Sequence, residues 1–196
     1  MIDGFLKFLE FGLYHIVSFS SYDHILFLVV LTAPYAFKDW TRLLLLVSFF
    51  TLGHTLSLLL GVYDIINLKV NVVEWLIPFT IIIMALYNIF TAGKASKKSN
   101  PIIIVCLVLF FGLIHGLGFS TYFKMMTASA ESKLLPLLEY TLGIEVAQII
   151  IVFVVLIFSF IGQSVFRFSL RDWVMVISAI VVGMIIPMLL STFGAV

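Results

Sequence analysis

The sequence predicts an all-α integral membrane protein, a bundle of about six transmembrane helices with an irregular, bent N-terminal segment. Hydrophobic residues make up 63% of its 196 residues and charged residues 11%, whereas soluble domains carry about 25% charged residues. Apolar runs of about 20 residues recur along the chain, which is the length that crosses a hydrocarbon core of about 30 Å. We therefore expect one transmembrane domain over 1–196, with the lipid bilayer as its surroundings.

The first expected span, 5–37, is the irregular one. Its first part carries a polar stripe at helical spacing, formed by Asp3, Lys7, Glu10 and Tyr14. Such a stripe favours an interfacial or re-entrant helix. On one straight helix His15 and His24 would point about 180° apart, because nine residues make two and a half turns. If both serve one site, the chain must bend between them, near Ser18 to Ser21.

The remaining spans are expected at 42–62, 73–92, 101–122, 136–166 and 173–194. Tryptophan lies near several span ends, where its ring prefers the headgroup level. Six spans place seven basic residues on one side, namely Lys38, Arg42, Lys94, Lys97, Lys98, Arg167 and Arg171, and four on the other, namely Lys7, Lys69, Lys124 and Lys133. By the positive-inside rule the seven are cytoplasmic, so both termini are expected outside.

Charge and cysteine content exclude several classes of function. The net charge is +1 and no long basic run occurs, which argues against nucleic acid as a partner. A single cysteine, Cys106, excludes an internal disulfide framework and a thiolate metal cluster.

Ionisable side chains at membrane depth point to a functional site, because each costs a few kcal/mol (about 3) unless it meets a partner or water. Six such side chains offer nitrogen or oxygen ligands: His15, Asp23, His24, His54, His115 and Glu145. Counted at about 1.5 Å per residue from the ends of their spans, His54, His115 and Glu145 lie in one layer of the outer half of the membrane. We therefore predict that the six converge on one intramembrane metal site.

Their chemistry narrows the choice of ion. Imidazole and carboxylate suit borderline divalent ions such as nickel, zinc or cobalt, whereas calcium would want more oxygen ligands. Each residue also has a simpler interpretation. Asp23 and His24 could lie in a polar turn, His54 could bond a neighbouring helix, and the glycines around His115 could serve only helix packing. An ionised Glu145 would still need a cation.

Five segments together resemble the HupE/UreJ family, bacterial inner-membrane proteins associated with hydrogenase and urease accessory genes. They are HIVSFSSYDHILFL, TLGHTLSLLL, VVEWLI, FGLIHGLGFS and LGIEVAQ. His15, Asp23 and His24 match the family's His-x5-Gly-x-Asp-His signature, with Ser21 where the family has glycine. The resemblance implies a multi-pass inner-membrane carrier for nickel, with cobalt or zinc as alternatives, and is compatible with an oligomer.

Two other functions fit the same residues. A histidine and carboxylate site could hold zinc that activates water, giving an intramembrane hydrolase of a lipid amide or ester. Its site chemistry is similar to that of the intramembrane ceramidase-like hydrolases, with Ser20, Ser21 or Ser57 as the serine. Alternatively, the protein could bind metal as an accessory protein or sensor without transporting it. The family resemblance favours transport over catalysis, although the cytoplasmic half of the spans offers few polar residues for a pathway beyond Asn88, Ser159 and Gln163. No catalytic residue is assigned.

Overall fold

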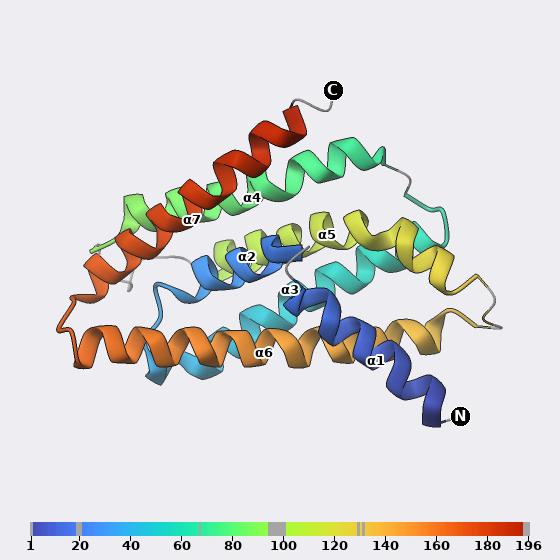
Figure 1. Ribbon diagram of the computed structural model, residues 1–196, viewed down its shortest axis with the longest axis horizontal. Helices are drawn as coiled ribbons and strands as arrows, with labels where there is room; N and C mark the ends of the chain where they lie inside the picture. The colour runs from blue at the N-terminus through green and yellow to red at the C-terminus, as the bar shows by residue number, and fades with distance from the viewer. Residues whose placement is uncertain are drawn as a thin grey trace.

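The computed structural model describes residues 2–18, 21–66, 68–93, 101–128, 130 and 132–193 (Figure 1). Within these ranges the chain forms seven α-helices, one short 3-10 helix and no strand, which confirms the all-α prediction. The elements are α1 (Ile2–Val17), α2 (Tyr22–Thr32), η2 (Phe37–Asp39), α3 (Trp40–Val62), α4 (Val70–Thr91), α5 (Pro101–Met126), α6 (Leu134–Ser164) and α7 (Leu170–Phe193).

Five helices, α3 to α7, are long and apolar enough to cross a membrane, within the described part of the chain. Helices α1 and α2 pass the same test only as a pair, and their axes are bent by 69°. Counting the pair as one broken span gives six spans, as predicted. The chain is thus a multi-pass membrane protein.

The break between α1 and α2 falls where the sequence predicts it. Helix α1 ends at Val17 and α2 begins at Tyr22, on either side of a serine-rich stretch; positions 19 and 20 lie outside the described residues. Serine weakens a helix because its hydroxyl competes for nearby backbone groups. The break brings the end of one helix against the start of the next.

The short helix α2 lies at the centre of the bundle. It contacts α1, α4, α6 and α7, and eight of its 11 residues are buried. A helix that is apolar on all sides belongs in such a position. The longer helices run roughly side by side around it, α3 against α5, α4 against α7, and α1 against α6 (Figure 1).

Glycines set the closest helix contacts. A Cβ on Gly112 of α5 would collide with the carbonyl oxygen of Phe50 on α3, and one on Gly116 would collide with that of His54. Gly12 and Gly143 make the same kind of contact between α1 and α6. Without a hydrophobic driving force between helices in lipid, such close packing holds them together.

The first prediction tests this contact. Gly112→Ala should lower the thermal unfolding temperature in detergent, because overpacking a tight contact costs about 1–3 kcal/mol. The matched control is Gly183→Ala on α7, where an added Cβ meets nothing within 4 Å. Equal unfolding temperatures for the two variants would contradict the close α3–α5 approach.

Candidate metal site

The helix break joins the first two histidines. His15 lies in the last turn of α1, and His24 lies with Asp23 in the first turn of α2. Their ring centroids are 4.8 Å apart. Had α1 continued straight, the two rings would point to opposite sides of one helix.

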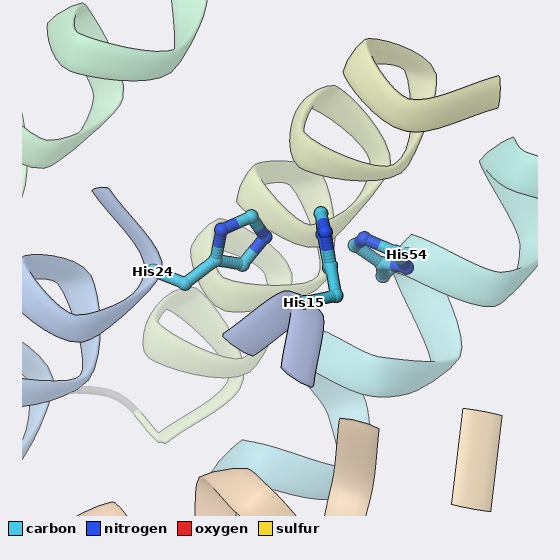
Figure 2. A group of neighbouring side chains, drawn as sticks. All are labelled: His15, His24 and His54. Atoms are coloured by element: carbon cyan, nitrogen blue, oxygen red, sulfur yellow. The ribbon is translucent and has the colours of Figure 1, made fainter. Parts of the chain in front are cut away.

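His54 completes a group of three from the middle of α3. Its ring centroid is 6.0 Å from that of His15 and 5.9 Å from that of His24. One ligand nitrogen of each of the three lies within 4.8 Å of the others. Figure 2 shows the three rings converging from three separate helices. His54 and His24 are fully or almost fully buried, and His15 is half-buried.

His115 of α5 stands beside this group. Its ring centroid is 5.1 Å from that of His24, and its side chain is 1% exposed. It is outside the set of nitrogens within 4.8 Å of one another. The structure therefore brings all four histidines into one region, with three close together and the fourth adjacent to His24.

Hydrogen bonds fix which nitrogen of two rings is available. The Nδ1 atom of His24 lies 3.2 Å from Oδ1 of Asp23, and Nδ1 of His115 lies 2.8 Å from the carbonyl oxygen of Phe111. Both oxygens accept, so each Nδ1 carries the hydrogen and each Nε2 keeps its lone pair. Metal-binding histidines are held in this way by a carboxylate or a carbonyl.

The available nitrogens have no partner within the described protein. They are Nε2 of His15, His24 and His115, and both nitrogens of His54, and all are buried. A buried polar atom left unsatisfied costs about 1–3 kcal/mol. A neutral imidazole has one lone-pair nitrogen, so the four rings offer at most one lone pair each, and a metal ion is a group that accepts such lone pairs.

The spacing fits a metal after a small adjustment. Two nitrogens bound at about 2.1 Å in a tetrahedral site lie about 3.4 Å apart. The nitrogens here lie within 4.8 Å of one another, so closure requires movements on the order of 1 Å, within the reach of side-chain rotation. Three neutral imidazoles supported by one carboxylate suit a borderline divalent ion better than calcium or magnesium.

Phenylalanine rings enclose the histidines. The ring of Phe119 lies 4.1 Å from that of His15, and that of Phe50 lies 5.2 Å from that of His115 and 6.4 Å from that of His54. These rings exclude water, which strengthens electrostatic interactions inside. The spacing of the phenylalanines in the sequence does not distinguish residues that enclose the histidines from residues of the general core.

Glu145 belongs to another polar group. It lies on α6 and accepts a hydrogen bond of 2.6 Å from Ser48 of α3, and it also contacts the hydroxyl of Thr51. It is not in the histidine group among the described residues. Its role as a ligand of the same ion stays a prediction, as do those of the other five candidates.

Two further residues of α6 are buried, although the sequence pattern marks neither as part of a site. Tyr140 stacks on Phe119 with ring centroids 5.2 Å apart, and its buried hydroxyl has no partner in the described protein. Glu139 is only 4% exposed although it lies near the start of α6. A position so close to a helix end gave no signal of burial.

The fold and the site together define a multi-pass membrane protein with an intramembrane histidine group. The profile of the family described as HupE / UreJ protein matches residues 1–192. The chain therefore belongs to the HupE/UreJ family, which confirms the resemblance seen in the sequence. The family is linked to nickel and cobalt uptake or accessory roles. Neither the curated proteins nor the solved structures contain a match to this chain.

The second prediction concerns the carboxylate behind His24. Asp23→Asn should weaken nickel or zinc binding by about 10–100-fold, because it removes the negative charge that raises the basicity of the His24 ring. The control is Asp64→Asn, which changes an exposed carboxylate that pairs with Lys124. Titration calorimetry of the purified protein measures both. Equal affinities for the two variants would place Asp23 outside the site.

Proposed function

We propose that the protein is a secondary carrier for a divalent transition metal ion, nickel foremost, with cobalt and zinc as alternatives. The observation that supports this most is the set of buried histidine nitrogens without partners, contributed by α1, α2, α3 and α5. Ligands drawn from four helices would respond to any relative movement of those helices. A carrier needs such a site, because it must both hold and release its cargo.

The burial of the histidines suggests an order of contact for the ion. His15 is the half-buried member and His24, His54 and His115 are buried, so the ion meets His15 first. His24 and His54 then close around it, with Asp23 holding the ring of His24. His115 offers a further nitrogen next to His24, toward which the ion passes when the first set opens.

Polar side chains continue beyond the histidines. Asn88 of α4 donates to the carbonyl oxygen of Val30 on α2 at 2.7 Å. Thr32 and Ser178 are fully buried, and their hydroxyls have no partner in the described protein. Together with Asn88, they support a polar route along α2.

The orientation we propose follows from the basic residues. In the described part of the chain, Lys38 and Arg42 lie near the start of α3, and Arg167 and Arg171 near the start of α7. These helix starts share one end of the bundle (Figure 1). The other three basic residues of this set, at 94, 97 and 98, lie outside the described residues. We assign this end to the cytoplasm of a bacterial inner membrane, with both termini outside.

The third prediction tests this orientation with cysteine labelling in a Cys106→Ser background. Ala128→Cys, after α5, should react with an impermeant thiol reagent in intact cells. Phe168→Cys, before α7, should react only after permeabilisation. Both positions are exposed. The opposite labelling pattern would therefore mean that the protein has the opposite orientation in the membrane.

The fourth prediction tests transport. Proteoliposomes holding the purified protein should accumulate nickel, cobalt or zinc, and His115→Ala should abolish uptake because the ion loses the ligand beyond His24. All four histidines of the chain lie in this region, so the control is Ser191→Ala, an exposed residue of α7. Uptake is measured as vesicle-trapped metal.

Other outcomes of the same experiment would identify the alternatives. Metal that binds tightly without entering the vesicles would indicate an accessory protein or sensor. Tightly bound zinc together with cleavage of a lipid amide or ester would indicate the hydrolase. Ser57, a serine considered for that chemistry, donates its hydroxyl to the carbonyl oxygen of His54 at 3.0 Å, which supports a structural role.

A further inference from the structure

Helix α3 carries a second polar face, turned toward α6. On α3 it consists of Ser48, Thr51 and Thr55, and on α6 of Thr141, Glu145 and Gln148. Ser48 donates to Glu145 at 2.6 Å, Thr51 lies 2.8 Å from Oε1 of Gln148, and the hydroxyls of Thr55 and Thr141 are 3.0 Å apart. These six residues form a polar seam of about two helical turns at membrane depth.

The hydroxyl of Thr51 has more acceptors around it than it can serve. It lies within hydrogen-bonding distance of the carbonyl oxygen of Val47, of Oε2 of Glu145 and of Oε1 of Gln148. One hydroxyl has one hydrogen. The other contacts bring oxygen against oxygen unless a positive charge lies between them or the Gln148 amide is turned so that its Nε2 donates to Thr51.

The buried amide of Gln148 is a second feature of the seam. It is 0% exposed, and its Nε2 atom has no partner within the described protein. Turning the amide over would let Nε2 donate to Thr51, but it would leave Oε1 without a partner instead. In the first orientation the atom without a partner is a donor, which a cation cannot satisfy, whereas in the turned orientation it is the acceptor Oε1, which a cation can bind.

The charge of Glu145 points the same way. Among the described residues, no cationic side chain forms an ion pair with it. An ionised carboxylate in lipid surroundings requires a compensating charge. The seam supplies hydroxyl and amide oxygens around that carboxylate but no positive group.

We propose that Ser48, Thr51, Glu145 and Gln148 form a second cation site, which takes a hard monovalent ion, sodium. Oxygen ligands select hard cations, just as imidazole nitrogens select borderline ones. A single carboxylate balances one positive charge, whereas calcium sites gather 6–8 oxygens and usually several carboxylates, about 3 or more. The oxygen site and the histidine group therefore bind different ions.

The two sites share α3. Thr51 precedes His54 by about one helical turn, so an ion bound between α3 and α6 holds the helix that carries a histidine of the other group. Ser48 lies on the exposed side of α3, at the outer edge of the seam. Sodium binding itself does not depend on the transport function proposed above.

The fifth prediction tests sodium binding by thermal unfolding of the purified full chain in detergent. Sodium chloride should raise the unfolding temperature saturably over potassium or N-methylglucamine chloride at equal ionic strength, because a ligand that binds only the folded state stabilises it. Glu145→Gln should remove the difference. Glu74→Gln, which changes an exposed glutamate on α4, should keep it.

A second measurement tests the sodium site if Glu145→Gln does not fold. Equilibrium binding of radioactive sodium to Thr51→Val should be weaker than to the native protein by about tenfold or more, since a lost ligand costs on the order of 1.4 kcal/mol. If sodium, potassium and N-methylglucamine give the same unfolding temperature, or if Glu145→Gln keeps the sodium effect, the proposal is wrong.

Nickel affinity separates this proposal from the metal site. Glu145→Gln should leave nickel binding unchanged, and His54→Ala should lose nickel binding while it keeps the sodium effect. If Glu145→Gln instead loses nickel binding and the native protein shows no sodium effect, Glu145 is a ligand of the transition metal. That result would overturn the sodium site without touching the proposed carrier function.

Discussion

The central constraint on this structure is the free-energy cost of burying imidazole nitrogens without hydrogen-bond partners inside a membrane protein. Four histidines from four helices turn such nitrogens toward one region, and each would lower its free energy by bonding water or a neighbouring helix instead. The helix break before α2 brings His15 and His24 together, and the glycine contacts between α3 and α5 bring those two helices close. Asp23 and the carbonyl of Phe111 each fix one ring so that its Nε2 lone pair stays available.

The sequence was sufficient to predict the fold, whereas the role of the four histidines as metal ligands stays a prediction. Long apolar runs define spans because backbone groups must be satisfied within each helix in lipid. The bend near Ser18 followed from the angle between His15 and His24 on one helix. Such arguments use only distance along the chain, which the sequence states directly.

The partition of polar residues between two groups could not be predicted. It depends on how each helix is rotated about its own axis, and helices that are apolar on most sides give little signal of rotation. Thr51 and His54 are about one turn apart on α3, a spacing that places two residues near the same side of a helix. In the structure Thr51 contacts Glu145 and Gln148 on α6, while His54 meets His15 and His24. That Glu145 and the histidines share one metal site because they share a depth in the membrane stays a prediction.

X-ray absorption spectroscopy of the nickel- or zinc-loaded protein tests the central claim most directly. The account predicts a first shell dominated by imidazole nitrogens at about 2.0–2.1 Å, with the multiple-scattering pattern of at least three histidine rings. His24→Ala should reduce that pattern by one ring. A first shell made only of oxygens, or a spectrum unchanged in His24→Ala, would show that the ion binds elsewhere and would contradict the account.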